Sequence, residues 1–291
     1  MPLALLSAML LQVGPMVSPG AAPAIAQPPL RDSKTRRRRQ VEAEPVTAPA
    51  EGRLTQCLRL IDSDAATALA SARSWAAREL GSARSEPLLC QGAALGAGGD
   101  WAGAEAAFRE GQQLSAASEP LLRARLQAMA GNAALAQGAA ERALPDLAAA
   151  GSALAGVGEK RLASGVAVDR ARALVALKRP AEAAAALDEA CKADPENGEA
   201  WLLNATLARR GGQLAAAQSA IEQAGRLLPV DADVGLEAGV IAMLAGHEDA
   251  ARRSWNSVVA TAPGSTAAAT ARGYLAQLGP LPMPARPAKK D

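Results

Sequence analysis

Residues 201–229 read WLLNATLARRGGQLAAAQSAIEQAGRLLP, and this stretch decides the fold class. Apolar residues recur at helical spacing on both sides of the pair Gly211–Gly212, which interrupts the pattern. Pro229 ends the second run, because proline lacks an amide proton and clashes with the preceding helical turn. The stretch therefore predicts two helices joined by a tight turn, which is a helix hairpin.

The same kinds of residue return 34 positions before and 34 positions after this hairpin. A small residue lies on each helix, a large apolar residue follows the second small one, and a proline closes each copy; the matching sets are Ala171, Ala205 and Gly239, then Ala183, Ala217 and Ala251, then Leu187, Ile221 and Trp255, and last Pro195, Pro229 and Pro263. Small side chains let two helices approach closely, and the large one fills the gap toward the next hairpin. A repeat of this length indicates stacked hairpins.

The period and its pattern of small, large and proline residues resemble the tetratricopeptide repeat (TPR) family. Trp201 occupies the family's Trp position, although Ala167 and Gly235 replace it in the neighbouring copies. The resemblance implies an all-α fold, an α-solenoid that winds as a right-handed superhelix of about five to six TPR-like helix hairpins. It also implies a broad role, which is the binding of other proteins.

Three looser copies precede this region at a longer spacing of 39 or 40 residues. They are marked by Ala65 and Leu69, by Gly92, Ala104 and Phe108, and by Gly131, Ala143 and Leu147. We expect the extra residues to lengthen the first helix of a hairpin rather than the loops. Ser265 can cap a last helix that runs through Leu278, so the predicted solenoid with its C-terminal capping helix spans residues 53–279.

Residues 1–26 have the shape of a secretory signal peptide. An apolar run from Leu3 to Val13 is followed by Gly and Pro residues and by the small-x-small site Ala24-Ile25-Ala26. The run is too short to span a membrane, so we expect no transmembrane helix in the mature chain. No Lys or Arg precedes it. A periplasmic or secreted protein is therefore the expectation, and a cytoplasmic protein is the alternative.

Residues 27–52 and 280–291 are rich in proline and charge, which predicts a disordered linker and a disordered tail. The linker holds the basic run Lys34–Arg39, for which two interpretations stay open: a patch for anionic lipid, or a solvated part of the linker. These two ends carry the excess of basic residues, so residues 53–279 are close to neutral although the whole chain has a net charge of +2. A near-neutral repeat region argues against a nucleic-acid partner.

The three cysteines indicate little about function. Cys57 and Cys90 fall in the first helices of neighbouring copies, and Cys191 falls in a second helix. A disulfide between Cys57 and Cys90 is compatible with an oxidising compartment. The sequence favours the other interpretation, two small buried hydrophobic residues. The spacing of the cysteines does not suit a zinc site.

The sequence also lacks the residues of a catalytic centre. The single histidine, His247, lies in a predicted turn beside Glu248 and lacks the second histidine of a zinc protease motif. The glycines of residues 92–99 do not follow a strand, which argues against a dinucleotide-binding loop. We therefore predict no catalytic residues, no metal site, no cofactor and no enzymatic activity.

In the family that the chain resembles, the first helices of the hairpins line a concave groove. Counting around the helix from Trp201 and Ala205, which face the partner helix, turns the next positions toward that groove. The candidate partner-binding residues are Met129, Asn132, Val168, Arg172, Leu202, Thr206, Arg209, Val240 and Met243. For Leu202, Val240 and Met243 a core position stays open as the alternative. The Lys and Asn with which some family members clamp a C-terminal carboxylate are not paired here, because the matching positions hold Ala128/Asn132 and Leu202/Thr206.

These observations predict a non-enzymatic scaffold or adaptor that holds a protein or peptide ligand in a TPR groove. The signal-peptide shape and the alanine-rich composition favour a bacterial periplasm or envelope. Two alternatives stay open, a cytosolic TPR regulatory module and an accessory subunit that stabilises an enzyme complex.

Overall fold

The computed structural model describes residues 52–279, and every regular element in this range is helical. The elements are α2 (Arg53–Ala76), η1 (Gly81–Arg84), α3 (Ser85–Ala97), α4 (Trp101–Leu114), α5 (Pro120–Ala136), α6 (Ala140–Leu154), α7 (Lys160–Ala176), α8 (Pro180–Ala193), α9 (Gly198–Arg210), α10 (Leu214–Leu227), α11 (Ala232–Leu244), α12 (Glu248–Thr261) and α13 (Thr266–Leu278). The predicted signal peptide (1–26), nearly all of the linker (27–52) with its basic run Lys34–Arg39, and the tail (280–291) lie outside the described residues.

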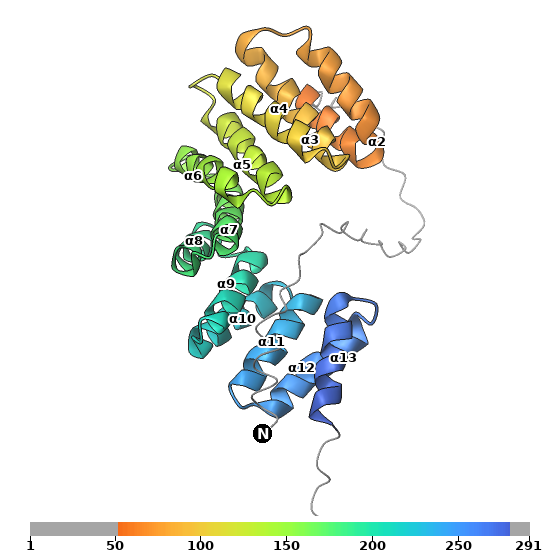
Figure 1. The fold of residues 1–291 in the computed structure, drawn as a ribbon, viewed down its shortest axis with the longest axis vertical. Coiled ribbons are helices and arrows are strands. Elements are labelled where there is room, and N and C mark those ends of the chain that lie inside the picture. Colours follow the sequence, from red (N-terminus) through yellow and green to blue (C-terminus); the bar gives the residue numbers. More distant parts are fainter. Residues whose placement is uncertain (1–51, 280–291) are drawn as a thin grey trace, which may run out of the picture. The chain divides into compact units, whose positions relative to one another are not determined.

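Helices α3 to α12 form five consecutive hairpins, each an odd-numbered helix followed by an even-numbered one (Figure 1). Each helix packs on the helices before and after it. Successive odd-numbered helices from α3 to α13 also contact one another, and no two even-numbered helices between residues 52 and 279 do so to a comparable extent. The fold is therefore the predicted α-solenoid of helix hairpins, with its odd-numbered helices closer together than its even-numbered ones.

On each odd-numbered helix from α3 to α11, a small residue is matched by a large residue 16 positions later on the following even-numbered helix. The five pairs are Gly92 and Phe108, Gly131 and Leu147, Ala171 and Leu187, Ala205 and Ile221, and Gly239 and Trp255. At Gly92, Gly131 and Gly239 an added Cβ would lie within 2.2 to 2.6 Å of the large side chain. The large residues are all buried. A small side chain on one helix is thus compensated by a large side chain on the other, which keeps the space between the two helices filled.

The longer spacing of two early copies lengthens their odd-numbered helices, as predicted, but α3 has only 13 residues and is preceded by the 3-10 turn η1 instead. Helices α5 and α7 have 17 residues each, whereas α9 and α11 have 13. At the other end of the solenoid, Ser265 accepts a hydrogen bond from the Ala268 amide and starts α13, which runs to Leu278. Helix α13 packs on α11 and α12 and covers the last hairpin.

The first helical segment, α2, breaks at Asp64, where the backbone leaves the helical region (φ −155°, ψ 86°). Its two parts fold back on each other: the Arg53 guanidinium lies 4.7 Å from the centre of the Trp75 ring, 22 residues later in the chain. Helix α2 is therefore a short, degenerate first hairpin.

Cys57 of α2 and Cys90 of α3 form a disulfide, with their Cα atoms 6.2 Å apart. This corrects the interpretation that the sequence favours, two unlinked buried hydrophobic residues. Both cysteines are nevertheless buried, so that part of the prediction is right. Cys191 is a free, buried thiol, and burial among apolar residues raises its pKa to about 11.

Within residues 52–279, each helix is too short or too polar to cross a membrane.

Candidate functional site

The predicted partner-binding residues all lie on odd-numbered helices, from α5 to α11. We call the solvent-facing side chains of these helices the odd-helix face. The structure divides the nine residues by exposure. Met129 and Arg172 are exposed; Asn132, Leu202, Thr206 and Met243 are half-buried; and Val168, Arg209 and Val240 are buried. The first six residues therefore have surface to offer a partner, and the last three do not.

Val168 and Val240 are core residues in this structure. Val168 is 1% exposed and belongs to the apolar cluster that joins α7, α8 and α9. Leu202 takes the same place in the next repeat but is only half-buried. Equivalent positions thus differ in burial because neighbouring helices pack differently along the solenoid. For Val240 the structure agrees with the core alternative that the sequence leaves open.

Arg172 is the most accessible cation among the nine residues. Its guanidinium donates to Asp169 on the same helix, at 2.7 Å, and to Glu199 on α9. All three side chains are partly or fully open to water, so the ion pairs are weak and exchangeable. A ligand carboxylate or backbone carbonyl can therefore compete for the guanidinium at little cost.

Arg209 has a different environment. Its Nε donates to Glu237 Oε1 at 2.5 Å, and the side chains of Arg209 and Glu237 are only 2% and 12% exposed. The pair links α9 to α11. Because it is buried, removing one partner would leave the other charge without water or a counter-ion. Arg209 thus acts as a structural contact between repeats and is unsuited to testing the odd-helix face.

Helix α5, which carries the exposed Met129, also holds two buried side-chain acceptors without a hydrogen-bond donor among the described residues. The Oδ1 atom of Asn132 and the Oε1 atom of Gln127 are both buried, and neither accepts a hydrogen bond from any described residue. Such acceptors are uncommon in folded proteins, because a missing hydrogen bond costs about 1–3 kcal/mol. Asn132 was predicted from its repeat position. Gln127 was missed, because it lies off the stripe that the helical count defines.

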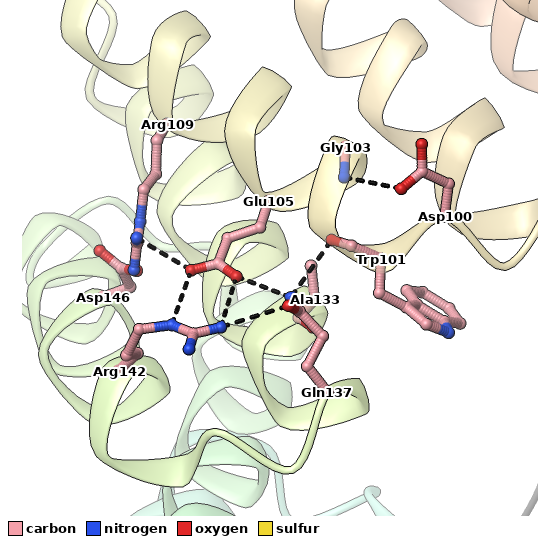
Figure 2. A network of polar contacts seen from close by, with 9 residues as sticks. All are labelled: Asp100, Trp101, Gly103, Glu105, Arg109, Ala133, Gln137, Arg142 and Asp146. Atoms are coloured by element: carbon pink, nitrogen blue, oxygen red, sulfur yellow. Dashed lines mark hydrogen bonds and ion pairs between the residues drawn. The ribbon is translucent and has the colours of Figure 1, made fainter.

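A second polar cluster, which the sequence analysis also missed, joins α4 to α6 (Figure 2). Glu105 accepts hydrogen bonds from Arg142, at 3.1 Å, and from Gln137, at 2.6 Å, and it pairs with Arg109. Arg109 also donates to Asp146 on α6 at 2.8 Å. No sequence signal marks these residues as a group, because they come from three separate segments of ordinary surface composition.

The pKa of Glu105 reflects two opposed effects. Burial raises this pKa, whereas hydrogen bonds from Arg142 and Gln137 and the charges of Arg109 and Arg142 lower it, and the sum is a lowered pKa. The carboxylate is therefore held ionised. An ionised carboxylate with its full set of donors indicates a structural tie between two hairpins rather than a general acid or base.

Little in the described range suggests reaction chemistry. His247 is exposed and immediately precedes α12. Within residues 52–279, no group of three His, Cys, Asp or Glu side chains is arranged to hold a metal ion.

Comparison with known proteins supports the family resemblance. A model of the tetratricopeptide repeat family matches residues 165–207, which cover most of α7, all of α8 and most of α9. Among curated proteins, none matches the sequence.

Several solved structures share the fold. The structure of Pseudomonas aeruginosa PilF superposes with a TM-score of 0.60 at 14% identity, covering 76% of this chain and 97% of PilF. BtubC from P. vanneervenii gives a TM-score of 0.57 at 17% identity, covering 82% of this chain and 98% of BtubC. YrrB, described as a TPR protein with an unusual peptide-binding site, gives 0.50 at 18% identity, covering 76% of this chain and 98% of YrrB. The chain is thus similar to tetratricopeptide-repeat proteins, in sequence over residues 165–207 and in fold over most of its length.

Proposed function

We propose that the protein is a non-enzymatic scaffold that binds a protein or peptide on its odd-helix face. The observation that carries the proposal is Arg172, an exposed guanidinium held only by solvated ion pairs with Asp169 and Glu199. The exposed Met129 extends this surface onto α5. Polypeptides offer complementary groups: carbonyl and carboxylate oxygens for Arg172 and apolar side chains for Met129. A peptide-binding site is also what YrrB, a protein of the same fold, is described as having.

We further propose that the chain works in an oxidising compartment, the bacterial periplasm or envelope. Two independent features support this location. One is the apolar N-terminal run followed by Ala24-Ile25-Ala26. The other is the Cys57–Cys90 disulfide, since such bonds persist mainly outside the reducing cytosol.

The binding proposal is tested by capture of native partners on the immobilised full chain, with Arg172→Glu compared against Arg179→Glu. The two arginines form a matched pair: their side chains are 43% and 45% exposed, and each pairs with a carboxylate three residues away. Arg179 lies in the turn before α8, off the odd-helix face. Partners that the wild type captures should be lost with Arg172→Glu and kept with Arg179→Glu. Equal capture by both variants would reject the odd-helix face as the binding surface.

The location is tested by N-terminal sequencing of the protein isolated from its own cells. Export with cleavage after Ala26 predicts a mature chain that starts at Gln27. An intact Met1 would reject export and favour a cytosolic module.

A further inference from the structure

The first helix of the described chain, residues 53–63 of α2, has few buried side chains and one covalent bond to the rest of the fold. Cys57 is the one buried residue in this stretch. Leu54 and Ile61 are partly buried and pack against a small cluster of Cys57, Ala72 and Cys90, and Leu54 also packs against the larger core of α3 to α5. An isolated helix of this length is marginal in water, because its nucleation is costly and its few hydrogen bonds do not offset that cost. Residues 53–63 therefore depend on docking.

The break at Asp64 separates this helix from the one that follows. The Asp64 carboxylate accepts hydrogen bonds from the Thr67 amide, at 2.9 Å, and from the Thr67 hydroxyl, at 2.6 Å. It thus caps the start of the next helical part, whose residues Ala68, Ala72 and Trp75 are buried. That part, residues 65–76, has its own cap and its own core contacts, so it does not need residues 53–63 to remain folded.

The non-covalent contacts of the first helix include a stack and an ion pair at its start. The Arg53 guanidinium lies over the Trp75 ring and 3.9 Å from the Glu79 carboxylate. Arg53 and Glu79 are both open to water, so their ion pair contributes little, and the stack on the buried Trp75 ring is the stronger of the two contacts. The covalent Cys57–Cys90 bond is the strongest link from this helix to α3.

We propose that the Cys57–Cys90 disulfide is a redox-dependent latch for the helix of residues 53–63. A dithiol reductant donates two electrons and two protons to the cystine, which becomes two thiols, while the reductant closes to its own disulfide. The helix then leaves its docking site on residues 65–76 and α3 and loses its helical structure. In a solenoid each unit contacts only its neighbours, so the change stays at this end of the chain. This inference does not rest on the proposed binding role.

The test is hydrogen–deuterium exchange of the full chain, read by peptide, with and without a dithiol such as dithiothreitol. Amide exchange in residues 53–63 should become at least about tenfold faster on reduction, while residues 65–76 and α9 to α12 stay unchanged. The double variant Cys57→Ala/Cys90→Ala should reproduce this pattern without reductant. This double variant lacks the disulfide even if the dithiol does not reach the buried bond. Cys191→Ala is the control, because Cys191 is a buried thiol outside the bond.

Two results would overturn the latch. One is unchanged exchange in residues 53–63 in the double variant, which would mean that the apolar contacts alone hold the helix. The other is faster exchange throughout α3 to α12, which would make the bond a general stabiliser of the solenoid. Non-reducing mass spectrometry of the isolated protein must also find Cys57 and Cys90 joined, and free thiols at both positions would reject the proposal.

Discussion

Charged side chains link successive hairpins of the solenoid in two regions, and the two regions differ in how far water reaches the ion pairs. Between α9 and α11, which are in contact, Arg209 and Glu237 form an ion pair whose side chains are only 2% and 12% exposed. Between α4 and α6, whose backbones are not in extensive contact, Glu105 is reached by long arginine side chains, one of them 52% exposed. The odd-numbered helices lie close together and exclude water from their ion pair. The even-numbered helices are farther apart, so the Glu105 cluster remains partly solvated.

The difference teaches that similar ion pairs have different energetic roles on the two sides of the fold. A buried pair is weak evidence of net stabilisation, but breaking it by removing one partner is expensive. A partly solvated network stabilises the fold less, because water can hydrate a charged group whose partner has been removed. Substitutions at the buried pair, at a packing contact and at the partly solvated network should therefore differ in their effect on stability.

The largest effect is expected at the buried pair. Arg209→Met leaves Glu237 buried without a counter-ion, and we expect it to lower the free energy of unfolding by about 3–5 kcal/mol. Urea unfolding followed by circular dichroism measures this loss, and hydrogen exchange of α9 and α11 locates it. The double variant Arg209→Met/Glu237→Leu is the control, because it removes both charges and should recover most of the stability. A double variant as unstable as the single one would contradict the role assigned to the unpaired charge.

An intermediate effect is expected from the packing contacts that both regions share. Gly239→Ala places a Cβ 2.2 Å from Trp255 Nε1, and that ring is fixed by a hydrogen bond of 3.1 Å to the Leu236 carbonyl. We expect a loss of about 1–3 kcal/mol from overpacking, with a similar loss for Gly92→Ala against Phe108.

Gly165 offers the matched control for this change. It lies in helix α7, and an added Cβ there would meet no heavy atom within 4 Å. Gly165→Ala should therefore stabilise the chain by about 0.5–1 kcal/mol through helix propensity. Equal thermal midpoints for Gly239→Ala and Gly165→Ala would contradict the claim that the Trp255 side chain fills the space beside Gly239.

The smallest effect is expected at the partly solvated network. Glu105→Gln keeps the side-chain size but removes the charge that Arg142 and Arg109 contact, and we expect a loss of about 1–2 kcal/mol at neutral pH. The folded-state pKa of Glu105 lies below its usual 4.5. Its contribution is therefore full above that value and fades as the pH falls through the folded-state pKa. Unfolding of wild type and variant should converge in acid, and a gap that stays constant down to pH 2 would contradict the role of the ionised carboxylate.

The repeat could be predicted from the sequence because its signal is local and periodic. Ala205, Ile221 and Pro229 recur at a fixed spacing, and each side chain's role follows from its place in the hairpin. The longer α5 and α7 followed from the wider spacing of their copies by the same logic, whereas the extra residues before α3 form η1.

The candidate site was only partly predictable, since burial depends on the neighbouring hairpin. Arg209 was assigned to an open groove from its repeat position, but its partner Glu237 lies 28 residues away on another helix. Val168 was placed by analogy with Leu202, whose exposure differs. The Cys57–Cys90 bond was not favoured because it depends on how closely the first helix packs on α3, which the repeat pattern does not define.

The central claim, that the odd-helix face holds a polypeptide, is tested most directly by photo-crosslinking in the cells of origin. A photoreactive residue replaces Met129 or Arg172 on the odd-helix face, or the exposed Ala185 on α8, and mass spectrometry identifies each adduct. The account predicts one common protein partner crosslinked from positions 129 and 172 and not from position 185. Adducts from position 185 alone, or the same adducts from all three positions, would contradict it.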